Sequence, residues 1–212
     1  MYVKVKCLIS RCIGVLGLLV LWPVFLIIAI LIKLDSEGPV FFKQQRLGLK
    51  GKPFEIYKFR SMCVGAERMG SGVYSNDGDP RVTKVGRILR ATSLDELPQL
   101  INLANGTMHL ISCRPPLLYH PWPLEEYSKV QLHMFDLRPG LTGWAQIHGR
   151  KDVELNHRIE LNCWYVDHVS FLLDIKIFFI TIFKVISNAD NENLEETVKE
   201  EKGIDRGLEN GN

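Results

Sequence analysis

The longest apolar run of the chain lies near its N-terminal end and predicts a membrane segment. No side chain is charged between Ile13 and Ile32, and about 20 apolar residues are enough for a helix to span a bilayer. We do not expect a cleaved secretory signal, because the run is longer than the apolar part of such a signal and ends in a charged, proline-containing sequence. Trp22 and Pro23 lie near its middle, where a proline removes a backbone hydrogen bond and kinks a helix.

Basic residues flank this apolar run on both sides. They are Lys4, Lys6 and Arg11 before it, and Lys33, Lys43, Arg46 and Lys50 after it. Since positive charge favours the cytoplasmic side of a membrane, both flanks are expected in the cytoplasm. The pattern therefore predicts a re-entrant helix over residues 1–34, kinked at Trp22 and Pro23, which enters one leaflet and returns. A tilted, kinked single span is the alternative.

Two short runs of apolar and aromatic residues follow and predict a β-hairpin. They cover residues 40–42 and 54–57, and the turn between them, over 47–52, is rich in glycine and lysine. The second run leads into Lys58 and Arg60. These two cations either lie at a solvated strand edge or form a clamp for phosphate.

Two adjacent carboxylates, Asp95 and Glu96, form the centre of the sequence from 92 to 100. Ser93 and Glu96 have the spacing of a capping box, and leucines then recur at helical spacing. Both carboxylates are therefore expected in a first helical turn, where unpaired N–H groups favour anions. One carboxylate could attack or bind a substrate while the other holds a metal. The plainer reading is that acidic residues simply occupy a helix N-terminus.

Several cations lie where they could meet a phosphate ester. A basic amphipathic segment over 81–90 ends at Arg90, after a polar, glycine-rich loop over 65–80. Arg114 precedes two prolines, which present it from a stiff loop. A glycine-containing turn over 138–146 runs from Arg138 to Gln146. Ordinary ion pairs and structural turns would use the same residues.

The C-terminal part predicts a helix and then an acidic tail. The helix, over 171–186, has an apolar face interrupted by charges, so it should lie in the membrane interface or pack on the core. Residues 188–212 are acidic, polar and expected to be disordered. We therefore divide the chain into a membrane helix over 1–34, a compact cytosolic domain over 35–187 and the tail.

The charge of the chain is unevenly distributed. The net charge is +2, and the tail, with eight acidic and three basic residues, carries −5, which leaves +7 for the rest. A basic body suits phosphate-rich partners such as nucleotides and anionic lipids. The five cysteines form no C-x-x-C pair, so neither a zinc site nor a disulfide framework is expected.

Taken together, these motifs resemble the bacterial sugar transferases of the small monotopic phosphoglycosyl transferase type. The resemblance runs from about Arg11 to Asn188 and is carried by residues 34–44, 58–62, 92–100, 114–115 and 138–146. Two positions depart from the usual pattern. Trp22 stands where the family often has serine before the proline, and Cys113 stands where it often has proline before the arginine.

The resemblance implies a fold and an activity. The fold would be mainly α with a short β-hairpin, a re-entrant membrane helix, a cytosolic catalytic domain and interfacial amphipathic helices. The enzyme would move a sugar 1-phosphate from a UDP-sugar to polyprenyl (undecaprenyl) phosphate and release UMP. It would thereby start the assembly of capsule, O-antigen or exopolysaccharide at the cytoplasmic face of the bacterial inner membrane.

The resemblance also assigns roles to residues. Asp95 would be the nucleophile that carries the phosphosugar, and Glu96 would help to hold Mg²⁺, with Asp95 as a second metal ligand in a direct mechanism. From the residue types, our own candidates for holding phosphate oxygens are the following residues: Lys58, Arg90, Arg114, Arg138 and Gln146.

Other classes of function remain to be weighed. An inactive membrane-anchored protein that binds nucleotide sugars or acts as a scaffold would be favoured by loss of a carboxylate, and both are present. Nucleic acid is not an expected partner, because no recognised motif or aromatic stacking platform is found. The expected partners are the UDP-sugar, polyprenyl phosphate and membrane lipids, and a homodimer stays open.

Overall fold

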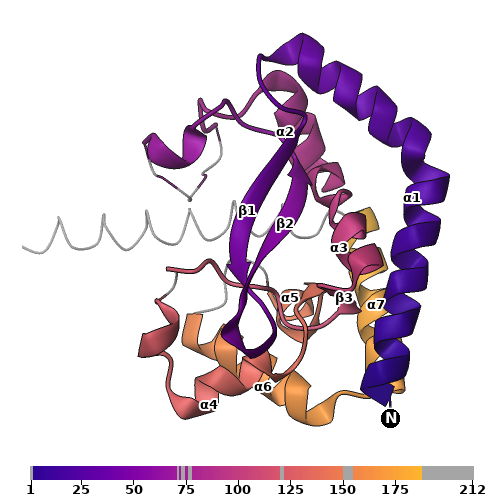
Figure 1. Cartoon of the computed structure of the whole chain (residues 1–212), viewed down its shortest axis with the longest axis vertical. Coiled ribbons are helices and arrows are strands. Elements are labelled where there is room, and N and C mark those ends of the chain that lie inside the picture. Colours follow the sequence, from indigo (N-terminus) through magenta and orange to yellow (C-terminus); the bar gives the residue numbers. More distant parts are fainter. Residues whose placement is uncertain are drawn as a thin grey trace, which may run out of the picture. The chain divides into compact units, whose positions relative to one another are not determined.

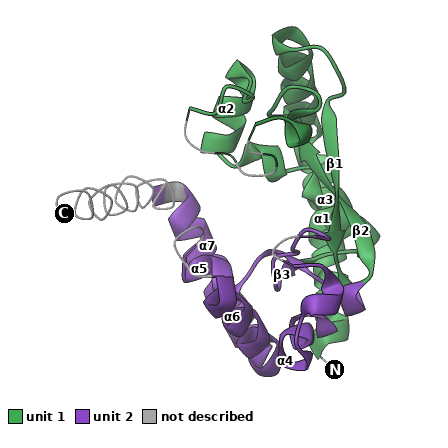
Figure 2. Cartoon of the chain, turned by 90° about the vertical axis from the view of Figure 1, so that its left-hand side faces the viewer, with its two compact units in different colours: residues 1–48, 52–109 green, residues 49–51, 110–212 purple. Residues whose placement is uncertain are grey.

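The computed structural model describes residues 2–70, 72, 75, 78–119, 122–149 and 155–187 (Figure 1). It is mostly helical with small two-stranded sheets, which confirms the predicted fold class at this level. Two compact units divide the chain (Figure 2). Unit 1 comprises residues 1–48 and 52–109, and unit 2 comprises residues 49–51 and 110–212. The domain boundaries at 34 and 187 stay predictions, because the first separates membrane from cytosol and the second separates the domain from a tail that lies outside the described residues.

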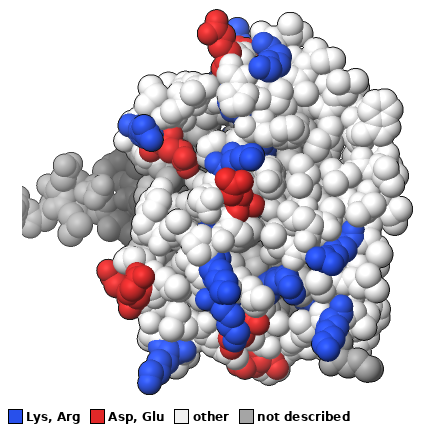
Figure 3. Space-filling model, in the orientation of Figure 1, with Lys and Arg blue, Asp and Glu red and all other residues white. Residues whose placement is uncertain are grey.

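Unit 1 begins with the helix α1, Tyr2–Asp35, which is long and apolar enough to cross a membrane. Pro23 lies inside this helix, and Figure 1 shows its axis turning along its length. The side chains of Leu19, Val20 and Trp22 are 66%, 72% and 62% exposed. Figure 3 shows only uncharged surface along the middle of α1. Both features suit contact with lipid, while the re-entrant path stays a prediction.

The predicted hairpin is present and longer than expected. Strands β1, Phe41–Leu47, and β2, Pro53–Phe59, pair antiparallel, with Phe41 opposite Phe59 and Leu47 opposite Pro53. Their turn contains the 3₁₀ helix η1, Leu49–Gly51, in which Lys50 has a positive φ of 55°. Three further helical elements of unit 1 precede the carboxylates or follow them. They are η2, Ala66–Arg68; α2, Lys84–Ala91; and α3, Gln99–Asn105.

The core of unit 1 lies between α1, the hairpin and α2. Ile28 and Ile32 of α1 are buried with Phe59 of β2 and Leu89 of α2. In the first half of α1, Gly14 approaches α3 so closely that a Cβ atom on this residue would lie 2.4 Å from the backbone nitrogen of Ala104. The second half of α1 is thus part of the core that carries the hairpin and α2.

Unit 2 is built mainly from short helices and two longer ones. A small sheet pairs β3, His109–Ile111, with β4, Gly140–Thr142. The helical elements are η4, Leu124–Glu126; α4, Lys129–Leu132; η5, His133–Asp136; α5, Trp144–Ile147; α6, Leu155–His168; and α7, Phe171–Ser187. The predicted disordered tail lies outside the described residues.

Helix α7 has one buried strip and one exposed apolar strip. Ile177 is fully buried and Asp174 accepts a hydrogen bond from the buried Tyr165 hydroxyl. Phe171, Phe179 and Phe183 are 54%, 64% and 71% exposed. The helix therefore packs on unit 2 and also offers an apolar surface, as expected of an interfacial helix, whose contact with lipid stays a prediction.

Candidate active site

The two central carboxylates lie in a tight turn and not in the first turn of an α-helix. The 3₁₀ helix η3, Leu94–Glu96, contains both, and α3 begins only at Gln99, with Pro98 at its N-cap. Ser93 has a left-handed backbone, with φ 57°, and its side chain makes no capping hydrogen bond. The predicted capping box is therefore wrong, and the anion-favouring helix N-terminus is lost with it.

The physical reason is tertiary packing on both sides of the turn. Leu94 and Leu97 pack against the cluster formed by α1, β2 and α2. A positive φ at a non-glycine residue is costly and persists only where the surroundings impose it. Burial of the two leucines thus places Asp95 and Glu96 at a fixed, half-buried position at the edge of the core.

Lys58 joins Glu96 at this turn. Its Nζ lies 2.8 Å from Glu96 Oε1, and the two side chains are 17% and 14% exposed. Lys58 comes from β2, which brings the hairpin to the carboxylates. Removing either partner of such a part-buried ion pair would leave an uncompensated charge beside the other. Two predicted site residues from separate motifs are therefore in direct contact.

Arg90 lies in the last turn of α2, shortly before the carboxylates. Its side chain is exposed, and Nη1 donates a hydrogen bond to Ser75 Oγ at 2.9 Å. It borders the 65–80 loop and belongs to the same unit as Asp95. Its role in holding phosphate stays a prediction.

Arg60 does not form the phosphate clamp that its position beside Lys58 suggested. The side chain is 4% exposed, and its guanidinium donates to the backbone oxygens of Ser36 and Glu37 and to the Ser36 hydroxyl. All of these hydrogen bonds go to residues directly after α1. Arg60 therefore has a structural role in place of the predicted contact with substrate.

Arg81 is likewise internal and organises the polar loop before it. It pairs with Asp79 at 2.6 Å, and this contact holds the pKa of that carboxyl far below its usual range. Its Nη1 donates to three loop carbonyls, those of Ala66, Met69 and Gly72. Arg81, the first residue of the basic segment over 81–90, is therefore a structural residue.

The remaining predicted residues, Arg114, Arg138 and Gln146, belong to unit 2. Arg114 and Arg138 are half-buried. Gln146 is buried in α5, and neither polar atom of its amide has a hydrogen-bond partner among the described residues. Whether these residues act together with the carboxylates of unit 1 stays a prediction.

A further cation, Arg158 of α6, was missed by the sequence reasoning. Burial lowers the pKa of the Arg158 guanidinium, and the positive charge of nearby Arg114 lowers it further. Two neighbouring guanidinium groups favour an anion beside them. No motif marks Arg158, because its proximity to Arg114 arises only from the fold.

Asp95 and Glu96 fit a magnesium site of the kind that substrate completes. No group of three or more His, Cys, Asp or Glu side chains suited to a metal is found among the described residues. Mg²⁺ nevertheless is often held by one or two carboxylates together with waters and substrate phosphates. Adjacent carboxylates offer such hard oxygen donors, and Lys58 already balances the charge of one of them.

Comparison with known proteins places this arrangement in a family. The bacterial sugar transferase family matches residues 1–188. An uncharacterized sugar transferase, EpsL of Bacillus subtilis, is 45% identical over 155 residues, covering 73% of this chain and 74% of that protein. The exopolysaccharide production protein PSS of Rhizobium leguminosarum is 40% identical over 178 residues, covering 78% of this chain and 87% of that protein.

A longer relative has a more specific name. The UDP-glucose:undecaprenyl-phosphate glucose-1-phosphate transferase of Escherichia coli is 42% identical over 176 residues, covering 81% of this chain and 38% of that protein. The chain thus spans well under half of the length of this relative. Because the family match covers nearly all of the chain, with both carboxylates and Lys58 inside it, the protein belongs to the bacterial sugar transferase family.

Proposed function

We propose that the protein is a phosphoglycosyl transferase that moves a sugar 1-phosphate from a UDP-sugar to undecaprenyl phosphate and releases UMP. The observation that carries this proposal is the turn that holds Asp95 and Glu96 against the apolar helix α1, with Lys58 on Glu96. The names of the Escherichia coli and Rhizobium relatives support the acceptor and a role in exopolysaccharide synthesis. The inactive-scaffold alternative is not favoured, because both carboxylates are present and the chain belongs to a family of sugar transferases.

The first step would be a displacement at phosphorus by Asp95. A carboxylate oxygen attacks the sugar-bearing phosphorus of the UDP-sugar, and the bond from that phosphorus to the bridging oxygen breaks. UMP leaves with the electron pair, and the sugar phosphate stays on Asp95 as a mixed anhydride. No proton needs to move, because an ionised carboxylate attacks and a phosphate leaves.

The second step would transfer the group to the lipid. A phosphate oxygen of undecaprenyl phosphate attacks the same phosphorus, the bond to Asp95 breaks, and the carboxylate is regenerated. The covalent step would let one site handle a water-soluble donor and a membrane-bound acceptor in turn. Direct attack by the lipid phosphate, with Asp95 as a second metal ligand, is the mechanism to be excluded.

Cations would make the phosphorus accessible to an anionic nucleophile. Glu96, with Asp95, would hold Mg²⁺, which when bound neutralises charge on the diphosphate. Lys58 and Arg90 would hold phosphate oxygens from unit 1, and Arg114, Arg138 and Gln146 would do so from unit 2. Arg158 is a further candidate through its closeness to Arg114. We place the enzyme at the cytoplasmic face of the inner membrane, where UDP-sugars are available.

The covalent step is tested with labelled UDP-sugar in the absence of lipid acceptor. Wild-type protein should retain the sugar phosphate and release one UMP per adduct. Asp95→Asn keeps the size of the side chain but cannot form the anhydride, so it should retain no label and lose at least about a thousandfold in turnover. Glu55, whose side chain is partly exposed and pairs with Lys43 at 3.5 Å, provides the control variant Glu55→Gln. A wild type without adduct under rapid quench, with kinetics that need both substrates bound together, would exclude the two-step mechanism.

A further inference from the structure

Three segments of unit 1 meet where α1 ends, and we call this region the α1 junction. It comprises the last residue of α1, Asp35, with residues 36–38 that follow it, residues 60–61 after β2, and residues 83–85 at the start of α2. The segments come from three separate parts of the sequence. None of them contains a residue assigned above to binding or catalysis, so the region needs its own explanation.

Arg60 is the central side chain of the α1 junction. Its Nη2 donates to the backbone oxygen of Ser36 at 2.7 Å and to Ser36 Oγ at 2.9 Å, while Nη1 donates to the backbone oxygen of Glu37. Its own backbone N–H donates to Val40 O at 2.9 Å. These acceptors directly follow α1, where the helix has its negative dipole end, so a positive guanidinium is favoured there.

Gly38 makes this approach possible. Its φ is +120°, and a Cβ atom at this position would lie 1.9 Å from Arg60 Nη1. A side chain would therefore be strained in its backbone and would collide with the guanidinium. Lys33 adds a second tie, because its Nζ donates to the carbonyl oxygen of Gly38 at 2.8 Å.

Asp35 connects the same end of α1 to α2. Its Oδ2 accepts a hydrogen bond from the backbone N–H of Val85 at 2.9 Å, in the first turn of α2. The backbone N–H of Thr83 donates to Ser61 O at 3.1 Å, which ties the start of α2 to the end of β2 as well. Asp35 thus satisfies a free N–H at the N-terminus of α2 from another helix.

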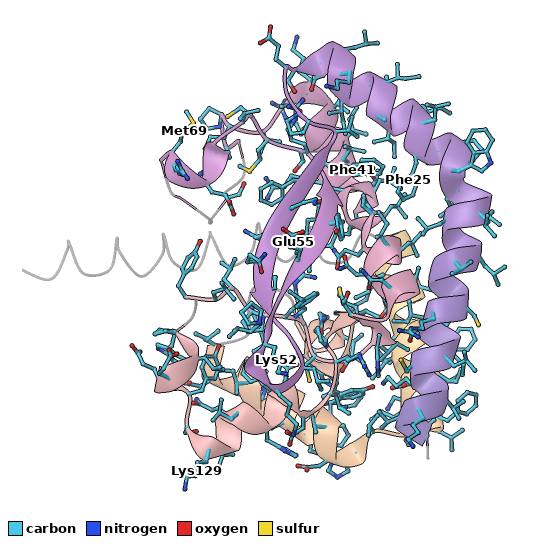
Figure 4. The ribbon with its side chains drawn as sticks, viewed as in Figure 1. Phe25, Phe41, Lys52, Glu55, Met69 and Lys129 are labelled. Carbon is cyan, nitrogen blue, oxygen red and sulfur yellow. The ribbon has the colours of Figure 1, made fainter. Side chains whose placement is uncertain are left out.

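The apolar core of unit 1 links the α1 junction to the turn that holds the two carboxylates. The ring of Phe59 lies 5.0 Å from that of Phe25 in α1 and 5.5 Å from that of Phe41 in β1. Figure 4 shows Phe25 and Phe41 between α1 and the hairpin. Leu94 and Leu97, on either side of Asp95 and Glu96, pack against the same cluster. The reacting turn is therefore built directly on the second half of α1.

We propose that Arg60 is a positioning residue that fixes the end of α1 and thereby sets where the lipid acceptor meets Asp95. This inference rests on the proposed function. The UDP-sugar diffuses in water, so its access to the turn does not depend on how far the turn lies from the membrane. The phosphate of a polyprenyl lipid, in contrast, is held at the membrane surface. The position of the turn relative to α1 therefore matters for one substrate more than for the other.

The test compares the two substrates in variants of the junction. Arg60→Lys keeps the charge but not the fork that reaches two carbonyls at once, and Arg60→Gln loses both. In both variants the KM for polyprenyl phosphate should rise about tenfold, since small misplacements are costly in catalysis. The KM for UDP-sugar and the yield of labelled adduct without lipid should stay within about twofold.

Asp35 gives an independent arm in case the Arg60 variants unfold. Asp35→Ala should also raise the KM for the lipid, and Asp35→Asn should restore it, because the amide oxygen can accept the same hydrogen bond from Val85. The matched control is Lys43→Gln, which removes an exposed cation from the same hairpin. Thermal unfolding of each variant identifies those that are folded.

The outcomes separate this inference from the proposed function. Equal losses for both substrates in folded variants, or a rise confined to the KM for UDP-sugar, would overturn the positioning role. A wild-type protein that neither releases UMP nor forms a lipid product would overturn the proposed function instead. A rise in the KM for the lipid alone, rescued in Asp35→Asn, supports the inference under either a two-step or a direct mechanism.

Discussion

Ser93 adopts a backbone conformation that serines rarely use, directly before the two carboxylates. Of the described residues other than glycine, only Ser93 and Lys50 have a positive φ. A left-handed conformation at a residue with a Cβ atom costs about 1–2 kcal/mol. Such strain is common next to functional residues, where packing elsewhere compensates for it. At Ser93, the compensation comes from the burial of Leu94 and Leu97.

The metal role proposed for Glu96 leads to a prediction about metal dependence. Because Glu96 is proposed to hold Mg²⁺, activity should vanish in EDTA and return with added Mg²⁺. Glu96→Gln should raise the Mg²⁺ concentration needed for half-maximal activity at least about tenfold. The measurement is UMP release across a Mg²⁺ titration, with Glu55→Gln as the control. Full activity of the wild type in chelator would remove the metal role assigned to Glu96.

At the scale of elements, His133 links η5 to α6 through two carboxylates. Its Nδ1 lies 2.6 Å from Asp136 and its Nε2 lies 2.8 Å from Asp167. Ionised carboxylates only accept hydrogen bonds, so this geometry favours the protonated ring, in which both nitrogens donate. The hydrogen bond to Asp167, and then that to Asp136, accordingly raises the pKa of His133. Lys50 also contacts Asp136, and its hydrogen bond lowers the pKa of that carboxyl.

This link predicts a pH dependence of stability. A raised pKa in the folded state means that the contribution of His133 is fully present below about pH 6.5, the ordinary value. It should be lost as the pH rises through the folded-state value. Because the side chains are partly exposed, His133→Gln should lower the Tm by only about 1–2 °C at pH 6. At pH 9 the difference from wild type should shrink, and a constant difference at both pH values would contradict the protonated bridge.

The elements show which parts of the fold could be predicted from the sequence. The hairpin and the long apolar helix depend on local patterns, namely apolar runs, glycines and a central proline, and both are present. The capping box failed because the backbone at Ser93 is set by packing on α1, which is remote in sequence. The site was predictable as residue types and motifs, whereas the structural roles of Arg60 and Arg81 depend on carbonyl groups that no motif contains.

At the scale of the whole molecule, the predicted topology remains to be tested. Pro23 lies inside α1, whose axis turns along its length. If the helix is re-entrant, residues before and after the apolar run face the same side. We expect Lys4→Cys, in a background without the five native cysteines, to be protected from an impermeant maleimide added outside the cell. Pro23→Leu should straighten the helix and make this cysteine accessible.

The control for this labelling is Lys52→Cys, next to the hairpin turn. It should react only after the membrane is permeabilised, both with and without Pro23→Leu. Labelling of Lys4→Cys from outside in the otherwise native helix would instead identify a simple span.

The tip of the hairpin has a consequence for how the protein can be divided. Residues 49–51 belong to unit 2, although both strands that carry them belong to unit 1. Lys50 of this tip reaches Asp136 at 2.5 Å, and Gly51 lies against Leu124. The chain thus enters unit 2, leaves it and enters it again, so a single cut at residue 109 cannot yield two complete modules. Truncation at that point would produce a second half that lacks residues 49–51, which belong to it.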